Sequence, residues 1–330
     1  MRIKVAQFGL GQIGKDITKL VLSRNRYELI GAVDKDEGKT GRDISELLGL
    51  ADKTGVVVTE SSREVLKKKP DLVFHSTASK LSRVHEQLRN IMEAGANVVS
   101  TSEELSYPYL QEKELSEKLD GIAKSSGVTF FGTGVNPGFA MDLLPLIFSG
   151  VSRTLDKIRV LRIQNASVRR KALQEKVGVG LPEDEFEKKV RQEGGHVGLI
   201  ESVSLVATGL GWQLDEIEDW TDPVVAEKKF ETEYFTAQPG ELRGIDQTAL
   251  GRVDGKEKVR LNLQMYAGAS NPVDEITLEG IPNLTLNVEG GIHGDIATPA
   301  IAVNSSQKVL QESPGLLTLL DFYPYLYNFE

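Results

Sequence analysis

The first 34 residues contain a strand pattern, a glycine-rich turn, a helix pattern and a second strand pattern in one register. The first strand pattern, residues 2–8, runs directly into Gly9-Leu10-Gly11-Gln12-Ile13-Gly14, a complete G-x-G-x-x-G. The second, residues 27–33, ends in Asp34, twenty residues after Gly14. This order is typical of the first β-α-β unit of a doubly wound α/β domain, and it constrains the fold more than any other feature.

The three glycines predict a site for a dinucleotide, because each has a separate task. Gly9 allows the tight turn, Gly11 lets a pyrophosphate approach the backbone, and Gly14 lets the helix pack closely on the strand. The helix that follows presents free N–H groups and the positive end of its dipole to the phosphates.

The residue that ends the second strand pattern bears on the choice of cofactor. The carboxylate of Asp34 can accept both hydroxyls of an adenosine ribose and would repel a 2′-phosphate, which favours NAD. Lys35 follows directly, and Lys39 and Arg42 lie nearby. These cations could bind a 2′-phosphate, so NADP stays open, although they could equally be solvated loop charges.

Composition excludes several classes of protein. The chain has 330 residues, enough for two domains, and a formal net charge of −9, which disfavours nucleic acid or an anionic membrane as a partner. It has no cysteine, which excludes disulfides, cysteine metal sites and a thiol nucleophile. No apolar run approaches the ~18 residues of a membrane span, and no signal peptide is visible. We therefore expect a cytoplasmic protein.

Alternating strand and helix patterns predict an α/β fold: a Rossmann doubly wound parallel sheet plus an α+β domain with a mostly antiparallel sheet. We expect an NAD(P)-binding Rossmann domain over residues 1–135 and a substrate and dimerisation domain over 136–298. A C-terminal helix and tail, 299–330, are expected to pack back on the first domain. An antiparallel sheet could pair across a two-fold axis, so a homodimer is expected. The later elements expected are helices 108–125, 139–148 and 298–311 and strands 157–163, 227–237, 259–267, 275–279 and 284–288.

Two adjacent carboxylates follow the strand pattern that ends at Thr101. Ligands of doubly wound sheets bind at the carboxyl ends of the strands, so Glu103 and Glu104 are the catalytic candidates. A carboxylate partly buried beside a nicotinamide would have a raised pKa, which suits a general base. Alternatively, Ser102-Glu103-Glu104 merely begins a helix, with Ser102 as its N-cap.

The same strand-end rule, with the glycine fingerprint, gives the cofactor-binding candidates: Gly9, Gly11, Gln12, Ile13, Gly14, Asp34, Lys35, Ser76, Thr77, Ala78, Ser100, Thr101 and Asn136.

A second group of residues is expected to bind the substrate. Basic residues stand just before a glycine loop, which is a suitable carboxylate site, or alternatively a solvated basic turn. Two histidines lie beside glycine pairs and are accessible to a ligand, or cap turns. The histidines lack metal-ligand spacing, so no metal is expected. The substrate-binding candidates are Arg169, Lys176, Gly178, Val179, Gly180, His196 and His293.

Five segments, Gly9–Gly14, 98–105, 132–139, 169–180 and 293–298, carry a resemblance that extends over the whole chain. With these motifs the chain resembles the 2,4-diaminopentanoate dehydrogenase family, which belongs to the dihydrodipicolinate reductase-like group and includes native amine dehydrogenases. The resemblance implies oxidative deamination with NAD or NADP, in which the amine at C4 of a 2,4-diamino acid becomes a ketone and ammonia is released. It also implies a glutamate at the nicotinamide edge, Glu103 or Glu104, of which Glu103 is favoured because it comes first after the strand.

Alternative functions stay open at this point. A close one is an amine dehydrogenase that acts on simple amines and ketones, and another is a dihydrodipicolinate reductase-like imine reductase. The second fits less well, because Arg169-Arg170-Lys171 stands where that enzyme has a histidine-rich stretch. From a different class, a non-catalytic NAD-binding regulator could use the same fold.

Overall fold

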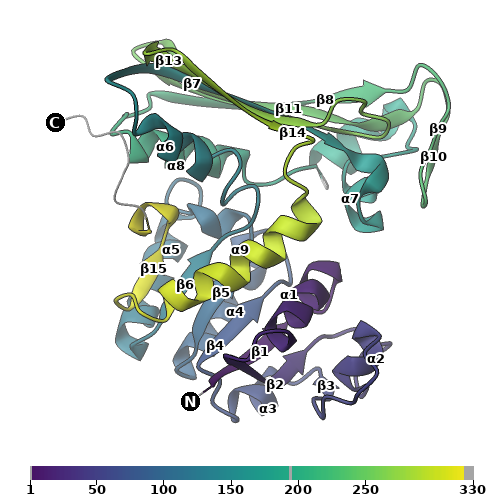
Figure 1. Ribbon diagram of the computed structural model, residues 1–330, viewed down its shortest axis with the longest axis vertical. Helices are drawn as coiled ribbons and strands as arrows, with labels where there is room; N and C mark the ends of the chain where they lie inside the picture. Colours follow the sequence, from purple (N-terminus) through teal and green to yellow (C-terminus); the bar gives the residue numbers. More distant parts are fainter. Residues whose placement is uncertain (1, 193–194, 323–330) are drawn as a thin grey trace. The chain divides into compact units, whose positions relative to one another are not determined.

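The computed structural model describes residues 2–192 and 195–322, which form two compact units (Figure 1). The first unit combines Met1–Val135 with Gly294–Phe322, and the second is built from Asn136–His293. The last eight residues of the expected tail, 323–330, lie outside the described residues. Within the described ranges, no helix is long and apolar enough to cross a membrane.

The first unit contains a seven-stranded sheet in the order β15-β6-β5-β4-β1-β2-β3, and every strand pairing in it is parallel. The predicted Rossmann-like sheet is therefore confirmed. The order reverses between β1 and β4, where doubly wound sheets bind their ligands. The strands are β1 (Ile3–Phe8), β2 (Tyr27–Val33), β3 (Val58–Thr59), β4 (Leu72–His75), β5 (Asn97–Ser100), β6 (Thr129–Gly132) and β15 (Gly315–Leu317).

Helices flank this sheet and close its core. Leu88 and Ile91 on one helix and Leu119 on another are buried with Val98 and Phe130 of the strands, so the apolar stripes face the sheet. The helices are α1 (Gln12–Leu22), α2 (Ile44–Leu48), α3 (Ser62–Leu66), α4 (Leu81–Glu93), α5 (Lys113–Ser126) and α9 (Gly294–Val309).

Two helices of the first unit begin elsewhere than expected. Helix α5 begins at Lys113 rather than 108, because residues 108–112 form a turn in which the Glu112 N–H donates to the Pro108 carbonyl. Helix α9 begins at Gly294 rather than 298 and continues through Pro299.

The second unit contains a six-stranded sheet in the order β14-β13-β7-β12-β11-β8, in which only β7 and β12 pair parallel. The mostly antiparallel sheet is thus also confirmed. Helices α6 (Leu143–Ser149) and α8 (Leu199–Gly209) pack on one face, here called the inner face (Figure 1). The strands are β7 (Thr154–Asn165), β8 (Glu216–Val225), β11 (Leu242–Val253), β12 (Lys256–Tyr266), β13 (Val273–Ile281) and β14 (Leu284–Glu289).

Other expected elements of the second unit are shorter or broken. The strand expected over 227–237 is a small hairpin of β9 (Phe230–Glu231) and β10 (Thr236–Ala237), because the Thr232 hydroxyl accepts the Tyr234 and Phe235 N–H groups and turns the chain. Helix α6 begins at 143 rather than 139, since the Asp142 carboxylate caps it at the Leu143 N–H. A short helix α7 (Lys171–Lys176) was not expected. After Pro182, where acidic residues around a proline predict a helix start, the chain forms a 3-10 turn, Glu183–Glu185, and a π-helical segment, Glu187–Gln192.

Candidate active site

The glycine turn after β1 has the close approaches that the fingerprint requires. Gly9 has a φ of +85°, and a Cβ there would lie 2.4 Å from the Ser76 carbonyl oxygen. A Cβ at Gly14 would lie 1.9 Å from the Gly9 carbonyl oxygen. A Cβ at Gly11 meets nothing within 4 Å. Gly9 and Gly14 are therefore required by the protein itself, whereas the space beside Gly11 is open to a ligand.

Helix α1 begins at this turn without a side-chain cap. Gly11 is its N-cap residue and forms no side-chain capping hydrogen bond. Gln12 and Ile13 occupy the first turn, where backbone N–H groups have no partner within a helix. The chain thus offers an anion site at the position that the glycine fingerprint predicts.

Asp34 is held rigidly at the end of β2. Its Oδ2 accepts the Leu10 N–H at 2.7 Å and its Oδ1 accepts the Asp36 N–H at 2.9 Å. Desolvation raises the pKa of Asp34, but these bonds and the Lys39 ammonium outweigh it, so the pKa lies below its ordinary value. The carboxylate is therefore ionised and fixed where a ribose could donate to it.

The three nearby cations have different partners. Lys39 Nζ lies 3.1 Å from Asp34 Oδ2 and 3.2 Å from Asp36 Oδ2. Arg42 pairs with Glu46, whereas Lys35 is exposed and lines the cavity described next. Lys39 is thus the cation that partly neutralises the carboxylate at the ribose position.

A cavity of about 560 Å³ lies at the carboxyl ends of β1, β2 and β4. Seven of the expected cofactor residues line it: Gly9, Gly11, Asp34, Lys35, Ser76, Thr77 and Ala78. Sequence reasoning missed Glu60, Ser62, Gln87 and Asn90, which also line it. Gln87 and Asn90 lie on α4, where nothing in the helix pattern distinguishes a side chain that faces a cavity from one that faces solvent.

The remaining cofactor candidates lie outside this cavity. Ser100 is fully buried, and its Oγ lies 2.9 Å from Nδ1 of His75, whose pKa burial lowers to about 4. The Thr101 N–H donates to the His75 carbonyl. Asn136 belongs to the second unit, where its Nδ2 lies 3.3 Å from His196 Nε2.

The two glutamates after β5 have different surroundings. Glu104 is buried, and its Oε2 accepts the Leu81 N–H, the first of helix α4, at 2.6 Å. Burial raises the pKa of Glu104, although that hydrogen bond and the Lys80 charge offset part of the shift. Glu103 is half-buried and precedes the 3-10 turn Glu104–Ser106. The raised pKa that was expected of one glutamate is therefore found at Glu104. Ser102, the expected N-cap, does not cap a helix, because its Oγ donates to the Ser79 carbonyl.

The glycine loop after α7 does not offer free amides. The N–H groups of Gly178, Val179 and Gly180 donate to the carbonyls of Glu175, Gln174 and Leu242. The loop also follows the carboxyl end of a helix rather than opening one. A substrate carboxylate would therefore need side-chain donors.

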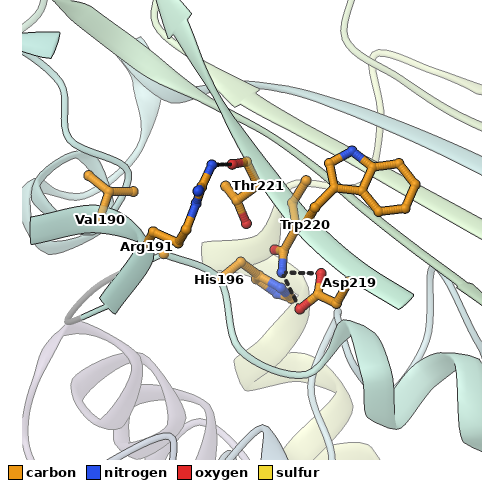
Figure 2. Close-up of a pocket in the computed structure, with 8 residues that line it drawn as sticks. Val190, Arg191, His196, Asp219, Trp220 and Thr221 are labelled. Atoms are coloured by element: carbon orange, nitrogen blue, oxygen red, sulfur yellow. Dashed lines mark hydrogen bonds between the residues drawn. The ribbon is translucent and has the colours of Figure 1, made fainter. Parts of the chain in front are cut away.

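The other substrate candidates are spread over the second unit. Arg169 is buried, with its Nη1 3.5 Å from Gln164 Oε1, and Lys176 ends α7. His293 precedes α9. His196 lines a second cavity, of about 280 Å³, with Arg191 and Asp219, neither of which was expected (Figure 2).

The parallel sheet, the glycine turn and the fixed Asp34 define a dinucleotide-binding domain of the Rossmann type. The family model for the N-terminus of dihydrodipicolinate reductase matches residues 3–122, and that for the 2,4-diaminopentanoate dehydrogenase C-terminal domain matches residues 139–325. The chain is 31% identical to a 2,4-diaminopentanoate dehydrogenase from Acetoanaerobium sticklandii, covering 97% of this chain and 93% of the relative. The chain therefore belongs to the 2,4-diaminopentanoate dehydrogenase family of oxidoreductases.

Further relatives agree with this assignment. The chain is 25% identical to an amine dehydrogenase from Streptomyces virginiae over 97% of this chain and 96% of that one. Its fold is similar to that of an amine dehydrogenase from Mycobacterium smegmatis, with a TM-score of 0.87, 27% identity and coverage of 99% and 98% of the two chains. The expected family and enzyme class are thus confirmed.

Proposed function

We propose that the chain catalyses the NAD-dependent oxidative deamination of 2,4-diaminopentanoate at C4, giving 2-amino-4-oxopentanoate and ammonia. The observation that carries the proposal is the buried carboxyl of Glu104 at the carboxyl edge of the parallel sheet, with a raised pKa. The named activity of the 31% identical relative supports the choice of substrate.

The residues around the cavity at β1 fit a nicotinamide dinucleotide. Gly11 and the uncapped start of α1 would hold the pyrophosphate, and Asp34 would accept the ribose hydroxyls. When bound, the nicotinamide supplies the acceptor for the hydride that leaves C4 of the substrate.

Glu104 would then act as the base. Its carboxylate takes a proton from the C4 ammonium, because only a neutral amine has the lone pair that expels a hydride from the same carbon. Oxidation leaves an iminium on the substrate. Glu104 then releases its proton to solvent and, again a carboxylate, takes a proton from water as the water adds to C4. It gives that proton to the departing nitrogen, and the new hydroxyl loses its proton to solvent as ammonia leaves, which gives the ketone. The Leu81 N–H holds Oε2, so Oε1 would be the atom that exchanges these protons.

Amine dehydrogenase activity on simple amines is the second candidate, favoured by the relatives from Streptomyces virginiae and Mycobacterium smegmatis. Initial rates with 2,4-diaminopentanoate and pentan-2-amine separate the two. We expect kcat/KM to be higher for the diamino acid, and a preference for pentan-2-amine would reject the proposal. The homodimer and the cytoplasmic location expected from the sequence stay predictions.

The cofactor proposal gives a prediction at Asp34. In Asp34→Ser the carboxylate that repels a 2′-phosphate is lost and Lys39 loses one of its two carboxylate partners, so we expect the ratio of kcat/KM for NADP to that for NAD to rise about 100-fold. Steady-state rates with each cofactor measure the ratio. Asp36→Ser is the matched control, since Asp36 also pairs with Lys39 but does not line the cavity, and should change the ratio less than about threefold. An unchanged ratio in Asp34→Ser would contradict the assignment.

A further inference from the structure

The cavity of about 280 Å³ in the second unit holds a carboxylate that has no cation. Asp219 lies on the inner face of β8, and its two oxygens accept hydrogen bonds of 3.0 and 3.2 Å from Gln247 Nε2 (Figure 2). In residues 2–192 and 195–322, no lysine or arginine forms an ion pair with it. Asp219 is exposed at the cavity, so a ligand can reach its carboxylate. Desolvation, partly offset by the Gln247 hydrogen bond, raises the pKa of Asp219. An ammonium ion in the cavity would pair with the carboxylate and stabilise its charged form.

Gln247 provides a second, independent sign of a ligand. Its side chain is 3% exposed, and it lines the same cavity from β11. Its Nε2 is committed to Asp219, but its buried Oε1 has no hydrogen-bond partner among the residues that the structure describes. Buried polar atoms are nearly always satisfied, so this acceptor calls for an N–H donor. The same ammonium could donate to both Gln247 Oε1 and Asp219.

Arg191 places a fixed positive charge at the same cavity. Its Nη2 donates to the Thr221 carbonyl at 2.8 Å, and its Nη1 lies 2.8 Å from Glu187 Oε2. Its guanidinium also lies 5.4 Å from the centre of the Phe186 ring. A guanidinium has five N–H groups, so three are left after these two contacts. They can bind a carboxylate while the backbone contact keeps the group in place.

We propose that this cavity, here called the amino-acid pocket, binds the C2 ammonium of a 2-ammonio-carboxylate substrate at Asp219 and Gln247 and its C1 carboxylate at Arg191. The volume of the pocket lies just below the usual range for sites of drug-sized ligands, which suits a short amino acid. The inference rests on the proposed function, because it assigns to the pocket the part of 2,4-diaminopentanoate that does not react. It also replaces the amides of Gly178–Gly180, which are committed to backbone carbonyls, as the carboxylate site.

Three substrates and two variants test the assignment. 4-Aminopentanoate lacks the C2 amine of 2,4-diaminopentanoate, and pentan-2-amine lacks the carboxylate as well. In Asp219→Asn we expect the ratio of kcat/KM for 2,4-diaminopentanoate to that for 4-aminopentanoate to fall about 10- to 100-fold, the range for a lost hydrogen bond to a charged group. In Arg191→Gln we expect the ratio for 4-aminopentanoate to pentan-2-amine to fall by a similar factor.

Asp222→Asn is the matched control for the first variant. Asp222 lies on the same strand, but the alternation of side chains along a strand places it on the opposite face from Asp219. It should leave the first ratio unchanged. If Asp219→Asn lowers kcat/KM equally for 2,4-diaminopentanoate and 4-aminopentanoate, or for neither of them, the inference is overturned. If the wild type does not turn over 2,4-diaminopentanoate at all, the proposed function is rejected instead.

If the wild type is inactive on 2,4-diaminopentanoate, calorimetric titration with 2-aminopentanoate can still test the inference. 2-Aminopentanoate carries the C1 and C2 groups but has no amine at C4, so its binding does not require turnover. In the presence of NAD we expect it to bind the wild type, with a Kd at least about tenfold higher in Asp219→Asn. No binding to the wild type, or equal binding to both proteins, would overturn the assignment.

Discussion

Glu104→Gln is expected to lower kcat about 100- to 10,000-fold, the range for loss of a general base. The glutamine has the same size, and its carbonyl oxygen can still accept the Leu81 N–H, so helix α4 keeps its contact. The melting temperature should therefore stay close to that of the wild type. The pH profile of the wild type gives a second readout, because the base is active only as a carboxylate. Since burial raises the pKa of Glu104, the acid limb of kcat/KM should lie above the usual range of a glutamate.

Glu103→Gln is the matched control, since it is the same substitution at the adjacent residue. We expect it to change kcat less than about threefold, as for most substitutions outside the reacting groups. Loss of turnover in Glu103→Gln with full turnover in Glu104→Gln would assign the base to Glu103, the residue that the sequence favoured. Full turnover in both variants would contradict the mechanism.

Asp274→Asn is expected to lower the free energy of unfolding of the second unit by about 3–5 kcal/mol, because it leaves a buried guanidinium unpaired. Arg162 and Asp274 are 2% and 0% exposed, and Arg162 Nη1 lies 2.5 Å from both carboxylate oxygens. Arg162 Nη2 and Asp274 Oδ2 also bind the carbonyl and the N–H of Ile292, each at 2.7 Å. The pair thus fixes the segment that ends at His293. Urea denaturation followed by circular dichroism measures the change.

A surface pair on the same two strands controls for the change of charge. Arg159 and Glu279 are 49% and 39% exposed, so Glu279→Gln should cost about 0–1 kcal/mol. The double variant Arg162→Met/Asp274→Leu removes both charges and should recover most of the loss. Equal losses in Asp274→Asn and Glu279→Gln would show that burial of the pair has no effect on stability.

The fold of the first unit was predictable because its signals are local. The glycine turn and Asp34 both belong to one β-α-β unit of about 34 residues, and buried parallel strands such as β4 appear as continuous apolar runs. The glycine fingerprint and the rule that ligands bind at the carboxyl ends of strands together named seven of the fourteen residues that line the cavity. The rule could not predict Gln87 and Asn90, because these two lining residues lie within helix α4 rather than at the end of a strand.

The second unit was harder to predict because its edge strand is acidic. β8 contains Glu216, Glu218, Asp219, Asp222 and Pro223, residues with low strand propensity, so no strand was expected there. The amino-acid pocket was missed with it. The glycine loop over 178–180 was expected to bind a carboxylate through its amides. Only the pairing with Leu242, distant in sequence, reveals that Gly180 is already committed.

The measurement that tests the central claim most directly is the stoichiometry of the reaction with 2,4-diaminopentanoate and NAD. Reduced nicotinamide is followed by its absorbance, and ammonia is assayed in the same samples, with pentan-2-amine in parallel. We predict one ammonia for each NADH formed and faster turnover of the diamino acid. Turnover of pentan-2-amine alone would make the chain a simple amine dehydrogenase, and NAD binding without reduction by either amine would contradict the account.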